Sequence, residues 1–599
     1  MHPQPTSVSF YRRGTILVIN WLLLWLAVPT TAVELLQPCS YRVITSGFGD
    51  SRQTHFHAGI DISTVGKEGI PVIAVASGHV SRLKVRHHGY GRALYYDTTT
   101  GVRAVYAHLS RFTRQIDSLV LAEQLVRGSY EVEFYPSADQ LQFVAGDTLG
   151  WSGQSGAGHP HLHFELRTLD DIAINPQRLY PHNPTGEAPR AQALLAVPCD
   201  PGTRINGFPW PLQLQNGDQF NCNGPVRFYY TATQANLPQQ SPLPVRRAEL
   251  RLDDRLLFFH NDSLDFEQNG WWRVLPPLAG SDWRLLNQHN LMSDSTIDQE
   301  CLEIPTGTHL QLIVEDDSGL QDTLTCDVSQ LIGGTPPVSR EEWRLFAGWL
   351  LVGADLLDQT QIPASFSVKL LASDCFQLVP TTPGLFQLCL DSLRTFLYLD
   401  NKMEDQISCG PWQLSLDQEP PEPLLLELVW DGERIRLSPA DLVLPQPLRL
   451  SIALTGRLNW LYQKQGREWQ PVTCSSNSAG DTLYHTLRYA GEYAILSDTL
   501  PPGIVFRHPS GANPLVGFDE QVQIQLTDAL SGVYDFSCRV DRIVVYPEYD
   551  ADRDRLLFHH DSRIAPGDHQ LQVEVTDRVG NRRQRSLEYR LLPLEDSGK

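Results

Sequence analysis

A short stretch of the chain places two histidines and a glutamate at the spacing of a strand. The segment 158–166 (GHPHLHFEL) alternates polar and apolar residues. Because successive side chains of a strand point to opposite faces, His161, His163 and Glu165 would share one face. Glu165 could then support one of the two imidazoles as a hydrogen-bond acceptor. A solvated polar face shows the same alternation, so this stretch alone does not distinguish a site from a surface strand.

A second pair of candidate ligands lies upstream, where His57 and Asp61 are four residues apart. In an extended segment both side chains point the same way, although such a pair is expected by chance about once in a chain this long. Together with His163 they offer two nitrogens and one oxygen. Three ligands and an open fourth position are typical of catalytic zinc, whereas structural zinc sites are closed, usually by thiolates. No cysteine lies between Cys39 and Cys199.

A third histidine lies between these two segments. The sequence 105–109 (VYAHL) alternates again, and its three apolar residues would form the buried face of a strand. Tyr106 and His108 would then lie on the opposite face. We therefore expect His108 to face the same groove as His161.

In combination these residues resemble the lysostaphin/LytM-like zinc metallo-endopeptidases, a family that cuts peptidoglycan peptides. The resemblance covers residues 41–182 and rests on SGFG at 46–49, HAGID at 57–61, the hairpin 69–80, GYG at 89–91, YAHL at 106–109, and GQSG at 153–156 leading into 161–165. It implies that His57, Asp61 and His163 bind Zn²⁺ and that His108 and His161 are the catalytic histidines. Residues 113–140 depart from the family as an insertion with one helix candidate at Asp117–Leu125, which we expect to reshape the groove.

The resemblance implies a zinc-dependent endopeptidase acting on the peptide stems or cross-links of peptidoglycan. Bound zinc would lower the pKa of its water towards neutrality and polarise the scissile carbonyl. No His-Glu-x-x-His motif is present in this region, so proton transfer would fall to His161 and His108. One alternative is a non-catalytic relative that binds peptidoglycan or activates other wall hydrolases, and the five filled positions favour the enzyme. Another is an adhesion or scaffold protein whose later modules carry the function.

The first 32 residues have the pattern of an export signal. Arg12 and Arg13 precede an apolar run from Ile16 to Val28, and small residues follow at 30–32. The run is shorter than the roughly 20 residues that span a membrane. We therefore expect cleavage and export to the periplasm, the cell envelope or the outside. The protein would touch a membrane only if this segment stays uncleaved.

Export would allow the ten cysteines to pair, and Cys375 with Cys389 and Cys199 with Cys222 are the nearest candidates. The formal net charge of -21 argues against a nucleic acid as partner, because phosphate binding requires clustered Lys and Arg. It also gives no electrostatic attraction to an anionic envelope, so recognition of a wall would have to be site-specific.

The chain has 599 residues, too many for one core, and its short strand-like runs predict a mostly β protein. We expect an antiparallel β-sheet domain of the LytM-like type, followed by several immunoglobulin-like (Ig-like) β-sandwich modules whose partner is unknown. Pro- and Gly-rich joints divide the chain into 1–32, 33–199, 200–337, 338–419, 420–500 and 501–599. Because the ligand set is complete before residue 199, the later modules should be separable from catalysis.

An internal repeat relates the second and the last of these segments. DRLLFFHNDS at 254–263 recurs as DRLLFHHDS at 554–562, and 307–315 resembles 567–575. Two modules of one type are the simplest explanation. His559, His560 and Asp561 could bind a metal, but the repeat keeps the apolar pattern and not the histidine pair. We therefore expect a structural role for these three residues.

Overall fold

The computed structural model describes residues 35–593 apart from 51–55, 157, 239, 254, 265–283, 286–300, 331–337, 347, 357–361, 373–374, 391, 400–405, 417–423, 441, 455–458, 512–513, 519 and 551–552. The protein is mostly β, as the sequence predicts. Within the described residues, α1 (Arg114–Arg127) is the one α-helix and η1 (Pro176–Arg178) the one 3-10 helix. No described helix is long and apolar enough to cross a membrane. The expected export signal lies outside the described residues.

The N-terminal domain is built on one large antiparallel sheet, in the order β1-β2-β11-β6-β5-β4-β8, with a smaller sheet β3-β10-β7 beside it. Its strands are β1 (Ile44–Ser46), β2 (Ile60–Ser63), β3 (Pro71–Ile73), β4 (Gly78–Val85), β5 (Arg92–Thr98), β6 (Arg103–Ala107), β7 (Leu109–Phe112), β8 (Val132–Phe134), β9 (Gln142–Phe143), β10 (Thr148–Ser152), β11 (His161–Arg167) and β12 (Ala173–Ile174). The histidine-rich strand β11 therefore lies between β2 and β6, in the interior of the sheet.

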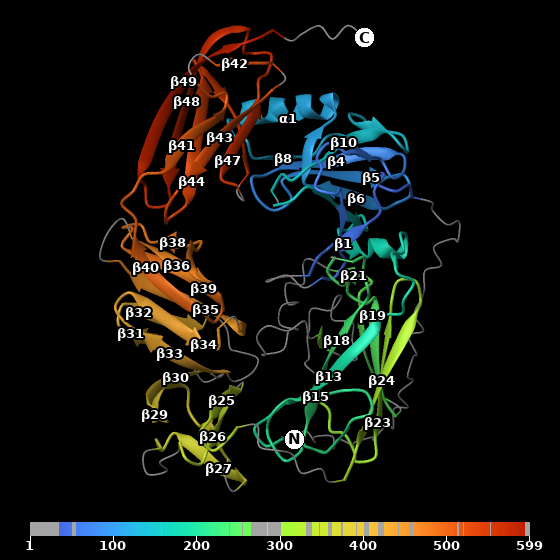
Figure 1. Cartoon of the computed structure of the whole chain (residues 1–599), viewed down its shortest axis with the longest axis vertical. Helices are drawn as coiled ribbons and strands as arrows, with labels where there is room; N and C mark the ends of the chain where they lie inside the picture. Colours follow the sequence, from blue (N-terminus) through green and yellow to red (C-terminus); the bar gives the residue numbers. More distant parts are fainter. Residues whose placement is uncertain are drawn as a thin grey trace, which may run out of the picture.

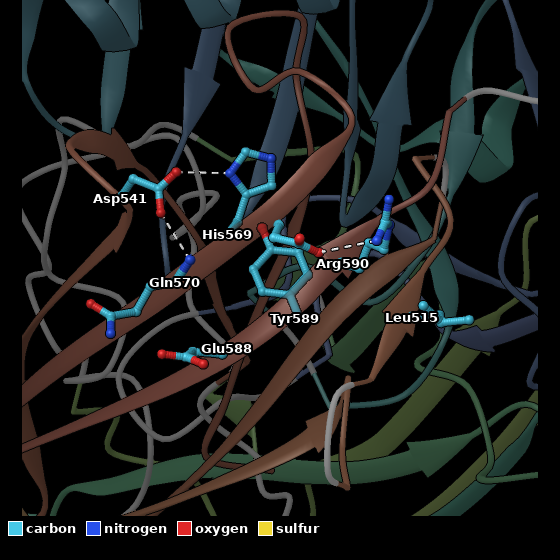
Figure 2. A pocket seen from close by; sticks show the side chains of 8 residues that line it. Leu515, Asp541, His569, Gln570, Glu588, Tyr589 and Arg590 are labelled. Atoms are coloured by element: carbon cyan, nitrogen blue, oxygen red, sulfur yellow. Dashed lines mark hydrogen bonds and ion pairs between the residues drawn. The ribbon is translucent and has the colours of Figure 1, made fainter.

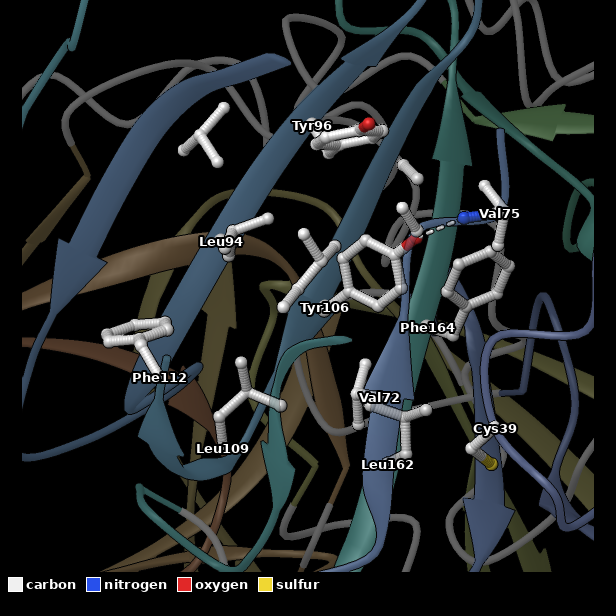
Figure 3. Packing of buried hydrophobic residues seen from close by; sticks show 14 of the residues in the cluster. Cys39, Val72, Val75, Leu94, Tyr96, Tyr106, Leu109, Phe112, Leu162 and Phe164 are labelled. Carbon is white, nitrogen blue, oxygen red and sulfur yellow. Dashed lines mark hydrogen bonds between the residues drawn. The ribbon is translucent and has the colours of Figure 1, made fainter. Parts of the chain in front are cut away.

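One face of this sheet packs on the domain's core (Figure 3). Leu162, Phe164 and Leu166 of β11 are buried there, as the alternation predicts. Tyr106 lies beside them, and its hydroxyl accepts a hydrogen bond of 3.2 Å from the Val75 N–H. The other face of β11 is left for its polar side chains.

The predicted insertion contains α1, which extends the expected helix by three residues at its start and two at its end. Ile116 and Val120 of α1 reach the core of the domain. The helix ends at Gly128, which has a φ of +64° that favours glycine. Tyr546, from the far end of the chain, packs against the same core, so the insertion lies next to the last module.

The second module, residues 190–328, is a pair of sheets with the orders β15-β13-β18-β22 and β16-β24-β23-β19-β20 and a small ladder β14-β17. Its strands are β13 (Arg190–Pro198), β14 (Arg204–Ile205), β15 (Leu212–Leu214), β16 (Gln219–Phe220), β17 (Cys222–Asn223), β18 (Val226–Thr233), β19 (Arg247–Leu252), β20 (Arg255–His260), β21 (Ser263–Leu264), β22 (Arg284–Leu285), β23 (His309–Glu315) and β24 (Gln321–Val328). β13 precedes the expected boundary at residue 199 but pairs within this module. β21 pairs with β12, which extends the sheet of the N-terminal domain.

The third module, residues 343–380, is one four-stranded sheet: β25 (Trp343–Phe346), β26 (Trp349–Gly353), β27 (Phe366–Ala372) and β28 (Cys375–Pro380). The fourth module, residues 384–497, is a sandwich of β29 (Gly384–Cys389), β30 (Leu393–Leu399), β31 (Ile407–Cys409), β32 (Trp412–Leu416), β33 (Leu424–Trp430), β34 (Arg434–Ser438), β35 (Val443–Ala453), β36 (Asn459–Gln465), β37 (Glu468–Pro471), β38 (Ser475–Ser476), β39 (Thr482–Tyr489) and β40 (Glu492–Ser497). β30 pairs with β33 and β32 with β35, so strand pairing crosses the joint expected at 419–420.

The last module, residues 503–591, is a sandwich with the sheet orders β41-β43-β47-β46 and β42-β49-β48-β44-β45. Its strands are β41 (Gly503–His508), β42 (Leu515–Val516), β43 (Gln521–Thr527), β44 (Val533–Val540), β45 (Ile543–Val545), β46 (Glu548–Asp550), β47 (Arg555–His559), β48 (Gly567–Asp577) and β49 (Arg582–Leu591). In the second module β16 runs parallel to β24, and here β42 runs parallel to β49. In each pair the longer strand, β24 or β49, follows the second half of the internal repeat in the sequence.

The modules follow one another around a ring that returns the last module to the N-terminal domain (Figure 1). Glu548 forms an ion pair with Arg92, 456 residues away in the sequence. Next to this pair, the Tyr549 N–H donates a hydrogen bond of 3.1 Å to His87 Nδ1. The N-terminal domain is thus held between two modules that are distant in the sequence.

The cysteine pairs expected from sequence proximity are both wrong. The structure joins Cys199 to Cys301, whose Cα atoms lie 6.1 Å apart although 102 residues separate them. Cys222 and Cys389 are free thiols, so neither expected pair forms. A disulfide requires two Cα atoms about 4.4–6.8 Å apart, and sequence spacing does not supply that distance.

Candidate active site

The sheet brings the predicted ligands together through its register. On β11, His163 lies opposite Asp61 of β2 on one side and opposite Ala107 of β6 on the other. His57 precedes β2 outside any regular strand, and its ring lies 4.9 Å from that of His163, between centroids. The three candidate ligands therefore come from two neighbouring strands and the loop before one of them.

Three possible ligand atoms converge at this point. His163 Nδ1 lies 2.9 Å from Asp61 Oδ1 and 3.0 Å from His57 Nε2, and the last two atoms are 3.1 Å apart. Zinc bonds of 2.0–2.1 Å in a tetrahedral site would separate its ligands by roughly 3.3 Å. The group formed by His57, Asp61 and His163 is one of two sets of potential metal ligands in the described part of the chain. Its donors and spacing fit a zinc ion.

Each histidine of the group uses its other ring nitrogen on a protein acceptor. His57 Nδ1 donates to the Gly47 carbonyl at 2.8 Å, and His163 Nε2 donates to Glu165 Oε1 at 2.8 Å. Because these acceptors cannot supply a proton, the lone pairs of His57 Nε2 and His163 Nδ1 remain for a metal. The expectation that Glu165 supports one imidazole agrees with this contact.

When no metal is bound, a proton on His163 supplies the positive charge of the group. Burial lowers the pKa of His163, but hydrogen bonds to Asp61 and Glu165 and their charges raise it to about 9. His163 would then be protonated at neutral pH and donate to Asp61. Since a ligating histidine must be neutral at the bonded nitrogen, metal binding would release this proton.

Glu165 is fully buried and held by three donors. The Tyr90 hydroxyl and the Arg167 guanidinium donate to it, together with His163. Burial raises the pKa of Glu165, but the Arg167 charge and the His163 hydrogen bond lower it to about 2. Arg167 was not among the predicted site residues, although its position on β11 shares the parity of the histidines and could have revealed it.

Arg167→Ala is expected to destabilise the N-terminal domain by about 3–5 kcal/mol, because it leaves the Glu165 carboxylate buried without its cation. Hydrogen–deuterium exchange of the peptides from β11 would measure the loss in this domain alone. Arg127→Ala is the matched control, since its exposed pair with Glu123 contributes only about 0.3–0.5 kcal/mol. Equal changes in the two variants would contradict the role of Arg167.

The two remaining histidines lie beside the ligand group. The rings of His108 and His161 have centroids 4.6 Å apart, and His161 Nε2 lies 3.6 Å from Asp61 Oδ1. His108 Nδ1 donates to the Ser155 carbonyl at 2.9 Å, and His161 Nδ1 to the His159 carbonyl at 2.6 Å. The Nε2 lone pair of each ring is therefore available to accept a proton.

The expected reason for the position of His108 is wrong. Tyr106 points into the core, on the face opposite the site, and simple alternation would send His108 there too. β6 ends at Ala107, and His108 adopts a positive φ of 60°, which turns its side chain to the other face. His108 thus faces His161 because the strand ends, and not because it shares a face with Tyr106.

Burial keeps both of these histidines neutral at neutral pH. Burial, together with the charges of the neighbouring His161 and His163, lowers the pKa of His108 to about 3. Burial also lowers the pKa of His161, although the Asp61 charge opposes this. Two neutral imidazoles with free Nε2 atoms can act as proton acceptors.

The segment that carries His57 is packed on the second module. Phe48, Phe56 and Ala58 belong to the core of that module and not to the core of their own domain. The Asn261 side chain donates to the Phe48 carbonyl across the same contact. These contacts argue against the expectation that all later modules are separable from the site.

Two other groups of polar residues are weaker candidates for a functional site. His560 Nε2 lies 2.7 Å from the Tyr589 hydroxyl, and Asp561 pairs with Arg563 at 2.6 Å, so their predicted structural role agrees with their contacts. Figure 2 shows a pocket on the last module in which Asp541 accepts from His569 Nδ1. His569 is the one histidine that lines this pocket. Neither set of potential metal ligands in the described residues includes His569.

The fold and the site define an antiparallel β domain with a group of three potential metal ligands and two further histidines. Residues 55–129 match Peptidase family M23. A relative from Neisseria meningitidis serogroup B (strain ATCC BAA-335 / MC58), the DD-carboxypeptidase/endopeptidase Mpg, is 32% identical over 147 residues, which are 24% of this chain and 28% of the relative. Within the N-terminal domain, residues 55–129 are therefore identified as a segment of the Peptidase family M23 type.

Other similarities cover the same part of the chain. An uncharacterized metalloprotease from Haemophilus influenzae (strain ATCC 51907 / DSM 11121 / KW20 / Rd) is 31% identical over 121 residues, 20% of each chain. The crystal structure of a zinc-containing peptidase from Vibrio cholerae is similar with 22% identity and a TM-score of 0.17, over 22% of this chain and 36% of that one. The chain thus spans little more than a quarter of the length of the Neisseria relative.

Proposed function

We propose that the protein is a zinc-dependent endopeptidase that cleaves the peptide stems or cross-links of peptidoglycan. The observation that carries this proposal is the convergence of His57 Nε2, Asp61 Oδ1 and His163 Nδ1 within 3.1 Å of one another, in a domain whose residues 55–129 match Peptidase family M23. The name of the Neisseria relative, a DD-carboxypeptidase/endopeptidase, supports this class of substrate.

The residues of the chain divide the chemistry between them. Bound zinc would supply a polarised carbonyl and a water of lowered pKa. His57, Asp61 and His163 would hold it, while Glu165 orients His163 through Nε2. This leaves the acid–base steps to the remaining pair of histidines.

His161 and His108 are placed to move the proton. Each has its Nδ1–H bound to a backbone carbonyl and its Nε2 free, so either imidazole can take a proton from the attacking water. The imidazolium that forms can return this proton to the nitrogen of the leaving amine when the peptide bond breaks. Because His161 Nε2 lies 3.6 Å from Asp61 Oδ1, it is next to the ligand group where the water must bind.

Product masses from purified peptidoglycan test this proposal. An endopeptidase should convert cross-linked muropeptide dimers into monomers with one new amine and one new carboxylate per cut. A carboxypeptidase would instead release single terminal residues. If a zinc-loaded protein binds peptidoglycan and leaves all muropeptide masses unchanged, the protein is a non-catalytic binder.

The proposal includes export, since peptidoglycan lies outside the cytoplasmic membrane. The predicted signal at 1–32 supports it. Determining the N-terminus of the mature protein distinguishes a cleaved signal from an uncleaved anchor.

A further inference from the structure

A second convergence of possible ligands lies at the joint between the fourth and the last module. Asp498 follows the last strand of the fourth module, Asp528 follows β43, and Asp577 ends β48. One carboxylate oxygen of each residue lies within 4.8 Å of the others. The cluster thus joins the start of the last module to two of its loops.

Hydrogen bonds hold these carboxylates in place. The Ser531 N–H donates to Asp498 Oδ2 at 2.9 Å, and the Gly532 N–H donates to Asp528 Oδ1 at 2.7 Å. The Asn581 side chain bridges the Asp498 carbonyl and Asp577 Oδ2, at 3.1 and 2.8 Å. Backbone donors fix the geometry but carry no full positive charge. The cluster therefore keeps its net negative charge.

The negative charge of the cluster is not neutralised by an ion pair. Asp498 and Asp577 are buried, with 3% and 1% of their surface exposed. Arg578 is the adjacent cation in the sequence, yet among the described residues no ion pair joins it to the three carboxylates. Burial and the charges of Asp498 and Asp577 raise the pKa of Asp528. Buried carboxylates of this kind need a cation.

A buried hydroxyl of the fourth module lies close to the same cluster. Tyr462 lies on β36, on the strand face opposite Leu461, which packs in the core of the fourth module. Its side chain is fully buried, and its hydroxyl has no hydrogen-bond partner among the described residues. Burial raises the pKa of this hydroxyl, and the charges of all three aspartates raise it further, so it lies close to the cluster. An unpaired buried hydroxyl requires a partner such as bound water.

We propose that Asp498, Asp528 and Asp577 bind one Ca²⁺ ion, with a water on that ion hydrogen-bonded to the Tyr462 hydroxyl. All donors are oxygens, which hard cations prefer, whereas zinc favours nitrogen and sulfur. Ligands on opposite sides of a Ca²⁺ ion with bonds of about 2.3–2.6 Å lie roughly 4.6–5.2 Å apart, which accommodates this cluster. Mg²⁺ would require a tighter octahedron with bonds of about 2.0–2.1 Å.

The ion would fix the angle between the two modules. Asp498 belongs to the connection that leaves the fourth module, while Asp528 and Asp577 belong to the last one. The last module in turn contacts the N-terminal domain through Glu548 and Arg92. Ca²⁺ would therefore keep the ring closed.

Calorimetric titration of the full chain with CaCl₂ tests the site, after metals are stripped and one equivalent of zinc is restored. We expect about one Ca²⁺ per chain, and at least tenfold weaker binding when Asp528→Asn and Asp577→Asn are combined. Asp568→Asn, an exposed carboxylate of the same module, is the control and should bind as the wild type does. Tb³⁺ in place of Ca²⁺ should show tyrosine-sensitised emission that falls in Tyr462→Phe.

Several results would overturn the site. These are no binding by the wild type at millimolar Ca²⁺, unchanged binding by the double variant, or equal affinity for Mg²⁺. If the double variant does not fold, the Tb³⁺ emission of Tyr462→Phe tests the site instead. If that variant binds Tb³⁺ with unchanged emission, Tyr462 does not face the ion and the assignment fails.

Discussion

His163→Ala and Asp61→Ala should lose both stoichiometric zinc and hydrolysis of peptidoglycan. Each removes one of three ligand atoms that lie 2.9–3.1 Å apart, and zinc held by two protein ligands is weakly bound. His161→Ala and His108→Ala should keep about one zinc per chain, while turnover falls by about 10²–10⁴-fold, the range for a positioned acid–base group. Variants of His161 and His163, which lie on one strand, would thus lose activity for different reasons.

The measurement is zinc content beside hydrolysis rate for the four purified variants, with circular dichroism to verify folding. His88→Ala is the control, because His88 is exposed and lies outside the ligand group. If His161→Ala loses zinc while His163→Ala retains it, the ligand and acid–base roles along β11 are reversed.

A fragment of residues 33–189 should fail to fold or to hold zinc, whereas residues 33–337 should do both. The shorter fragment exposes Phe48, Phe56 and Ala58, which pack in the core of the second module. Exposing a buried phenylalanine costs about 1.5–3 kcal/mol, so the two together remove much of the roughly 5–15 kcal/mol that stabilises a domain. The segment that carries His57 would lose its support.

Zinc titration and thermal unfolding of both fragments measure this dependence. The longer fragment retains the Cys199–Cys301 disulfide and serves as the control. Full zinc affinity in residues 33–189 would mean that the second module is only attached to the site and does not support it.

The sequence was sufficient to predict which side chains of β11 share a face. Alternation placed His161, His163 and Glu165 on one face and the apolar residues on the other, as the structure has them. Alternation failed at His108, because β6 ends one residue earlier and a positive φ reverses the side chain. Alternation predicts the direction of a side chain only for residues inside the strand.

Contacts between distant segments could not be predicted. The partner of Cys199 lies 102 residues away, and Asn261 contacts the Phe48 carbonyl across a module boundary. The joint expected at 419–420 rested on its prolines, yet β30 pairs with β33 and β32 with β35 across it. Sequence spacing carries no information about such pairings.

Zinc dependence of cleavage tests the central claim most directly. Protein stripped of metal should be inactive on purified peptidoglycan, and the rate of cross-link cleavage should rise with added zinc until it saturates near one equivalent per chain. A cleavage rate that does not depend on zinc, or one equivalent of bound zinc without any cleavage, would contradict the account.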